Sequence, residues 1–200
     1  MSLAVAERLN QATKVTDNNV GTVGFSDYIR ATEYGDGLNH TTLLTCTLLP
    51  VTTGNTTGAS FGSKLLYTFP TGGILLGGCN AYFSGIFFNT AAGSTGDIDG
   101  GGSGDYSIGT TATADATLST TDVEILPSTA MLDPFVTGVG RSNVSSILAV
   151  PLSKLGNVTA ITAYLNVIID DADVADAAAG DLVYFSGNVW IQWNFLGDVV

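Results

Sequence analysis

The segment ITAYLNVIID, residues 161–170, alternates between apolar and polar side chains along most of its length. Successive side chains of a β-strand point to opposite faces of the sheet, so a period of two predicts a strand with one buried face. This segment is therefore typical of a strand that covers the core of a β protein. Its apolar positions are Ile161, Ala163, Leu165, Val167 and Ile169, and its polar positions are Thr162, Tyr164 and Asn166.

Three further segments show the same alternation. Gly, Asn, Asp and Pro separate the runs, and helical periodicity is almost absent after residue 15. Short strands with such punctuation predict an all-β fold, and at this length we expect a single-domain β-sandwich or jelly roll. The expected apolar faces are Val189, Ile191, Trp193 and Phe195; Leu44, Cys46 and Leu48; and Leu65, Tyr67 and Phe69.

The first residues of the chain depart from the β pattern. Leu3, Val5 and Leu9 form a weak apolar stripe, which indicates a short helix or an extended arm. We therefore expect an N-terminal arm over residues 1–19, followed by one jelly-roll-like β domain over residues 20–200.

Composition excludes several classes of protein. Six Lys and Arg against eighteen Asp and Glu give a net charge of −12, although only 12% of the residues are charged. An acidic chain without a Lys/Arg cluster is a poor nucleic-acid binder, because phosphate would be repelled. No apolar run reaches the roughly 18 residues that a membrane-spanning helix needs. We expect neither nucleic acid nor a membrane as a partner.

Few residues indicate chemistry. Cys46 and Cys79 lie in apolar, strand-like surroundings and are expected to be buried free thiols. His40 is the only histidine, so a zinc site is not expected, and its place beside Asn39 suggests an exposed loop. Nothing singles out a catalytic pair among the carboxylates. We therefore expect no enzyme, no catalytic residues and no cofactor.

One acidic group is a weak candidate for a metal site. Asp170, Asp171, Asp173 and Asp176 crowd the segment between two strong strands. Carboxylates packed together repel unless a cation lies between them, and hard cations such as Ca²⁺ take several carboxylate oxygens. The alternative is an acidic hairpin tip that charge keeps soluble.

The two tryptophans have different expected roles. Trp190 and Trp193 are three residues apart, so a strand directs them to opposite faces. Trp193 joins the apolar face and is expected in the core. Trp190 projects to the other face, where it would anchor a subunit interface unless part of the same chain covers it. Together with Leu3, Val5 and Leu9 of the arm, Trp190 completes the set of expected interface residues.

Three segments resemble capsid decoration proteins, also called cement or head-stabilisation proteins, of tailed bacteriophages. They are residues 116–131 (ATLSTTDVEILPSTAM), residues 163–173 (AYLNVIIDDAD) and residues 186–198 (SGNVWIQWNFLGD). The resemblance implies a β-sandwich or jelly-roll subunit that forms homotrimers on the outer capsid surface of the virion. It also implies the major capsid protein as a partner, a structural role without catalysis, and an N-terminal arm that reaches a neighbour.

Two other classes share a β-rich composition. A receptor-binding or fibre module of a virion would be expected to carry aromatic residues in its loops, whereas the loops here are rich in Gly, Ala and Asp. A prokaryotic cell-surface module would suit the acidic, Thr-rich chain but normally carries a secretion signal. Glu7 and Arg8 interrupt the apolar pattern that such a signal requires.

Overall fold

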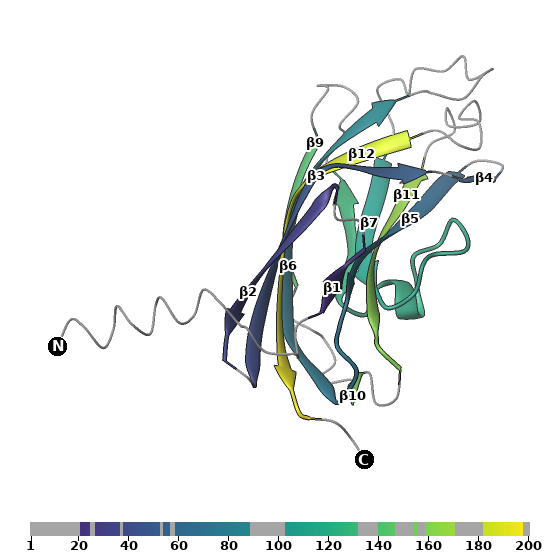
Figure 1. Cartoon of the computed structure of the whole chain (residues 1–200). Helices are drawn as coiled ribbons and strands as arrows, with labels where there is room; N and C mark the ends of the chain where they lie inside the picture. Colours follow the sequence, from purple (N-terminus) through teal and green to yellow (C-terminus); the bar gives the residue numbers. More distant parts are fainter. Residues whose placement is uncertain are drawn as a thin grey trace.

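Two antiparallel sheets face each other across a shared core, which confirms the predicted all-β sandwich (Figure 1). The computed structural model describes residues 21–24, 27–36, 38–52, 54–56, 59–88, 103–131, 140–146, 154–155, 159–170 and 182–197. Within these ranges the only helix is a single 3-10 turn, η1 (Thr120–Asp122). Residues 1–19, the predicted arm, lie outside the described part of the chain.

Each sheet is assembled from strands that are distant in sequence. Sheet A contains β1 (Thr22–Val23), β4 (Gly54–Thr56), β5 (Ala59–Thr68), β7 (Ser103–Gly109), β8 (Leu126–Met131) and β11 (Thr162–Asp170). Sheet B contains β2 (Ile29–Gly35), β3 (Asn39–Thr52), β6 (Ile74–Phe88), β9 (Gly140–Ser146), β10 (Lys154–Leu155) and β12 (Leu182–Phe195). The strand orders are β1-β5-β11-β7-β8 and β10-β6-β12-β3-β2, with β4 beside β5 and β9 beside β6.

The pairings are nested in the manner of a jelly roll. In order of decreasing separation along the chain, β3 pairs with β12, β5 with β11, β6 with β9, and β7 with β8, so each pair lies between the strands of the one before. Two further pairings, β12 with β6 and β11 with β7, join these pairs into the two sheets. Such a nested set of antiparallel strands is the double Greek key of the jelly-roll architecture. The fold class predicted from the sequence is therefore confirmed at the level of topology.

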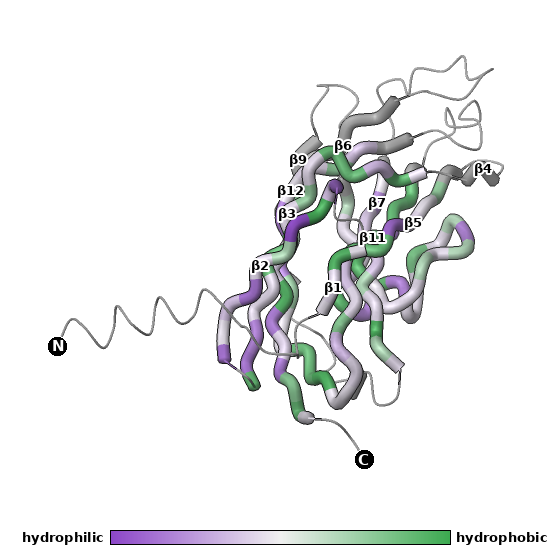
Figure 2. The backbone as a smooth tube through the Cα atoms, in the orientation of Figure 1, coloured by the Kyte–Doolittle hydropathy of each residue, from purple (hydrophilic) through white to green (hydrophobic). Residues whose placement is uncertain are grey.

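The core lies between the sheets, where apolar side chains from both meet. Figure 2 shows hydrophobic positions alternating with hydrophilic ones along the strands, as the period of two requires. Aromatic rings pack edge to face across the layer, with the Phe69 ring 5.6 Å from Trp193 and the Phe83 ring 5.5 Å from Tyr106. The predicted inward residues Ala163, Leu165, Val167, Val189, Ile191, Trp193 and Phe195 are all buried.

β-Bulges change two of the predicted faces. In β5, Leu66 is the extra residue between the pairs Tyr67–Ala163 and Leu65–Tyr164, so Leu66 is buried and the prediction of an inward Leu65 is wrong, since that side chain is only half-buried. Leu44 and Cys46 are buried as expected, but the prediction for Leu48 is wrong, since this side chain is 47% exposed. Between the pairs Leu49–Phe185 and Cys46–Gly187, β3 has two residues where β12 has only Ser186. The extra residue turns Leu48 outward and lets Leu49 take the inward position.

The glycine pair at residues 77–78 lies inside one long strand, β6. Gly78 pairs with Gln192 while Leu76 pairs with Trp193, so Gly77 is the additional residue of a further bulge. A glycine inside a strand is typical of such a bulge.

Candidate binding face on sheet B

A chain of hydrogen bonds runs through the interior of the sandwich near β2. The Glu33 carboxylate enters from this edge strand and accepts hydrogen bonds from the hydroxyls of Thr42, at 2.8 Å, and Tyr67, at 2.5 Å. The Trp193 indole Nε1–H donates to Thr42 Oγ1 at 2.8 Å. Burial, followed by the nearby Glu33 charge, raises the pKa of the Tyr67 hydroxyl, so this group stays a donor. The network joins the two sheets, and we assign it a structural role.

His40 belongs to the same interior region, so the prediction of an exposed loop histidine is wrong. The side chain is only 3% exposed and lies in β3, with its ring 4.0 Å from the Trp193 indole and 9° from parallel. Neither ring nitrogen has a hydrogen-bond partner among the described residues. His40 pairs with Trp193 of β12, and this strand position directs its ring toward the core. The prediction of a loop rested on the neighbouring Asn39, which gave no sign of the strand.

Neither cysteine forms a disulfide and both are buried, as predicted. Burial raises the pKa of the Cys46 and Cys79 thiols to about 12. The thiolate is the nucleophilic and metal-binding form of cysteine, so these thiols are unreactive at neutral pH. Among the described residues no group of His, Cys, Asp or Glu is arranged to hold a metal ion.

A serine motif also fails as a catalytic site. Residues 58–62 read GASFG and match the Gly-x-Ser-x-Gly spacing of a nucleophile elbow. In that motif the serine stands on a sharp turn between a strand and a helix. Here Ser60 lies inside β5, paired with Ile169 on one side and Asn55 on the other. The backbone context therefore excludes an elbow of that kind.

The outer face of sheet A is covered by a segment of the same chain. Residues 110–125, between β7 and β8, fold back over the sheet and are held there by Asn166. Its side-chain amide donates to the carbonyl oxygens of Thr111, at 3.0 Å, and Asp122, at 3.1 Å, and its Oδ1 accepts from the Thr113 amide at 3.0 Å. Asn166 is fully buried although it faces away from the core. We call residues 110–125 the cover segment.

The covered side is acidic. Asp115, Asp122 and Glu124 belong to the cover segment, and Asp105 projects from β7 beneath it. A shallow hollow of about 230 Å³ is lined by Asp105, Thr117, Ser128 and Ile168, with Ala116 and Leu118 completing it. The Ser128 hydroxyl donates to the Asp105 carboxylate at 3.0 Å. The residues that line the hollow include no His or Lys, and the hollow offers hydroxyl and carboxylate groups for hydrogen bonding.

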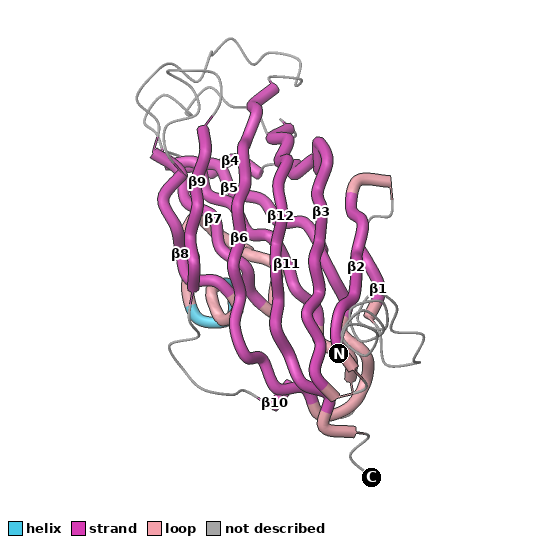
Figure 3. The backbone as a smooth tube through the Cα atoms, turned by 90° about the vertical axis from the view of Figure 1, so that its left-hand side faces the viewer, coloured by secondary structure: helices cyan, strands magenta, loops and turns pink. Residues whose placement is uncertain are grey.

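The outer face of sheet B carries no comparable cover among the described residues. Figure 3 looks at this face, with β9, β6, β12, β3 and β2 side by side. Trp190 stands near its centre, 42% exposed, with its ring stacked 6.1 Å from that of Tyr34. We call this surface the Trp190 face. Its members on four strands are Arg30, Thr32 and Tyr34; Thr41, Leu43, Thr45 and Leu48; Asn80 and Tyr82; and Asn188, Trp190 and Gln192.

The chemistry of the Trp190 face differs from that of the rest of the surface. Among its described members on β2, β3, β6 and β12, Arg30 is the only charged residue, whereas the chain as a whole carries −12. Among the described residues, the carboxylates at the ends of β2 beside this face are those of Asp27 and Asp36, which lie in turns. Hydrogen bonds from the backbone amides of Asn39 and Leu38 lower the pKa of Asp36, which keeps this turn ionised. The face is therefore an aromatic and amide-rich surface suited to binding.

Sequence reasoning located part of this face. Trp190 was expected to project away from the core, and the structure places it on the uncovered side of sheet B. Leu3, Val5 and Leu9, the other expected interface residues, lie outside the described residues. Of the carboxylate group, Asp170 ends β11, while Asp171, Asp173 and Asp176 also lie outside them.

Several members of the face were missed. Tyr34 and Tyr82 belong to strands whose pairing with β12 is known only from the fold. Alternation in β3 would have revealed Leu43 as an outward residue beside Thr41 and Thr45, because its neighbours Thr42 and Leu44 are the buried ones. Leu48 gave no such signal, since its position depends on the bulge.

Comparisons with models of protein families, with curated proteins and with solved structures gave no significant match. The helices in the described part of the chain include none long and apolar enough to span a membrane.

Proposed function

We propose that this protein is a non-enzymatic structural virion protein that binds the outside of a tailed-phage capsid and stabilises the mature shell. It would act as a homotrimer, with the major capsid protein and further copies of itself as partners. The resemblance of three sequence segments to decoration proteins suggests the class. The observation that carries the proposal is the difference between the two outer faces of the sandwich.

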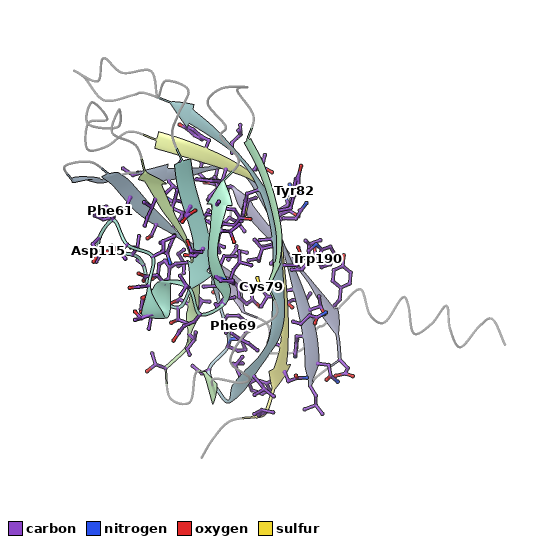
Figure 4. The ribbon with its side chains drawn as sticks, turned by 180° about the vertical axis from the view of Figure 1, so that it is seen from behind. Phe61, Phe69, Cys79, Tyr82, Asp115 and Trp190 are labelled. Carbon is purple, nitrogen blue, oxygen red and sulfur yellow. The ribbon has the colours of Figure 1, made fainter. Side chains whose placement is uncertain are left out.

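A subunit of a shell buries one surface against protein and presents another to water. The Trp190 face has an exposed indole and a single charged side chain, Arg30. The opposite side is covered by the chain itself and carries Asp105, Asp115, Asp122 and Glu124. Figure 4 shows Trp190 and Tyr82 on one side of the molecule and Asp115 on the other. Charge depletion with an aromatic anchor is the composition of an interface core.

The physical effect of such a subunit follows from mass action. A protein that binds only the mature shell stabilises it in proportion to how far its concentration exceeds the dissociation constant. Many copies add their contributions over the lattice. The acidic side would face solvent, where net negative charge keeps free subunits soluble and away from nucleic acid.

The test is the number of copies in purified particles, measured against the major capsid protein by quantitative mass spectrometry. We expect a ratio near one to one, or one to a few. Adding the purified chain to particles that lack it should also raise the temperature at which they release their DNA. A handful of copies per particle would instead indicate a fibre or vertex protein, and absence from particles would overturn the proposal in favour of a surface module.

A further inference from the structure

We propose that the Trp190 face binds a second copy of this chain, and that Leu48 is placed by a strained β-bulge to complete the contact. This inference rests on the proposed function, because it names the contact through which the subunits of the proposed oligomer would associate. It goes beyond that function in assigning the residues of the contact and the backbone device that positions one of them.

The backbone at Leu48 is the first observation. Its φ is +48°, in the left-handed region that residues other than Gly, Asn and Asp rarely adopt. The Leu48 amide donates to the Ser186 hydroxyl at 2.9 Å, a hydrogen bond that holds the bulge in this conformation. Strain that the surrounding structure maintains is common at functional sites.

The identity of the residue adds to this argument. A glycine or asparagine would form the bulge without strain, yet the position holds a leucine whose side chain is 47% exposed. Tyr28, which is 38% exposed, lies beside it, since the Thr47 amide donates to the Tyr28 carbonyl oxygen at 2.9 Å. The bulge therefore adds an apolar group at the border of the face, where neither the fold nor solvation favours one.

Charge is the argument for a second copy as the occupant. Each copy carries −12, so two copies repel wherever carboxylates face each other. The Trp190 face contributes no carboxylate and presents Arg30, which an acidic copy attracts. It is the described surface on which a second acidic chain meets the least repulsion.

Hydrogen bonding points the same way. Beside Trp190 the face carries Thr45, Asn80, Asn188 and Gln192. Hydroxyl and amide groups both donate and accept, so this surface can form hydrogen bonds with polar groups of a second copy. A cluster of one charge would instead require a partner of opposite charge. The stacked Tyr34 and Trp190 rings then supply the apolar anchor of the contact.

The test compares three proteins by sedimentation velocity over a range of concentrations: the full chain, Leu48→Asn and Leu196→Asn. Asparagine tolerates the left-handed region, so Leu48→Asn is expected to melt at the same or a higher temperature while its self-association weakens by roughly tenfold or more. Leu196 is 54% exposed and lies off the Trp190 face, after β12, so the same change there should leave association unaltered.

Other results would overturn the inference. Association of Leu48→Asn as tight as that of the full chain would exclude the contact. A full chain that stays monomeric at every concentration but covers particles would place the face on the shell, which would reject the contact and the homotrimer but leave the shell-binding role intact. Self-association that appears only after deletion of residues 1–19 would assign the face to the arm. Association that Leu48→Asn weakens, in a protein absent from particles, would support this inference and reject the proposed function.

Discussion

Thr42 shows how much of the interior depends on one small side chain. It is fully buried in β3, accepts a hydrogen bond from the Trp193 indole and donates one to the Glu33 carboxylate. Buried polar groups are costly when unpaired, and a carboxylate more so than an indole. The hydroxyl therefore satisfies one group from β12 and one from the edge strand β2 at the same time.

We expect Thr42→Val to lower the free energy of unfolding by about 1–3 kcal/mol, because the isosteric change leaves the Trp193 N–H unpaired in the core. Urea unfolding monitored by tryptophan fluorescence measures this effect. Thr110→Val is the matched control, since the Thr110 hydroxyl donates to Glu124 at an exposed site. That variant should stay within about 0.5 kcal/mol of the parent. Equal losses in the two variants would contradict a special role for Thr42.

At the scale of elements, the cover segment decides which outer face of the sandwich is accessible. It contains one 3-10 turn and otherwise irregular backbone, so its position depends on contacts with sheet A. Asn166 and Ser107 supply these contacts from β11 and β7, the latter by donating to the Asp122 carbonyl oxygen at 2.7 Å. Hydrogen bonds from side chains that point away from the core thus help to hold the cover segment on sheet A, together with the buried Ile125.

Asn166→Ala should loosen the cover segment while leaving the sheets intact. The change removes the hydrogen bonds of the amide to Thr111 and Asp122, and the Thr113 amide keeps only the Ser63 hydroxyl as its partner. We expect faster hydrogen exchange at residues 110–125 and a loss of about 1–3 kcal/mol in the free energy of unfolding.

Asn188→Ala, on the exposed Trp190 face, provides the comparison for this variant. It should leave exchange in the cover segment unchanged. Unaltered exchange in Asn166→Ala would mean that other contacts hold the segment.

At the scale of the whole molecule, nested pairing ties the two halves of the chain together. The Thr45 hydroxyl of β3 donates to Asn188 of β12 across 143 residues of sequence, whereas β7 and β8 are neighbours along the chain. Long-range pairings of this kind close late, because the entropy of closing a large loop opposes them. The described domain therefore requires both halves, as a single domain should.

The boundary of the arm gives the prediction at this scale. Deletion of residues 1–19 should preserve the β-type circular dichroism spectrum, because the Gly21 amide still donates to the Tyr67 hydroxyl and β1 still pairs with β5. Binding of the truncated chain to the shell or to neighbouring subunits should weaken, since the arm is the segment expected to reach them. A truncated chain without its β signal would place these residues in the core and show the boundary to be wrong.

The sequence by itself determined the strands and their inward faces wherever no β-bulge interrupted the strand. Leu165 and Val167 in β11, and Val189 and Ile191 in β12, are buried as their spacing predicts. The reason is local, because the direction of a side chain in a regular strand depends only on its position along that strand. Burial of both thiols followed from the same apolar surroundings.

Only the tertiary structure decided where that regularity fails and which surface remains open. Leu48 turns outward because β3 has one residue more than β12 at the bulge. His40 turns inward because pairing with β12 extends β3 to Asn39, which puts His40 in phase with the buried Leu44. Trp190 is exposed because the cover segment packs against sheet A and not against sheet B. Each of these outcomes depends on contacts between segments far apart in the chain, which local alternation does not encode.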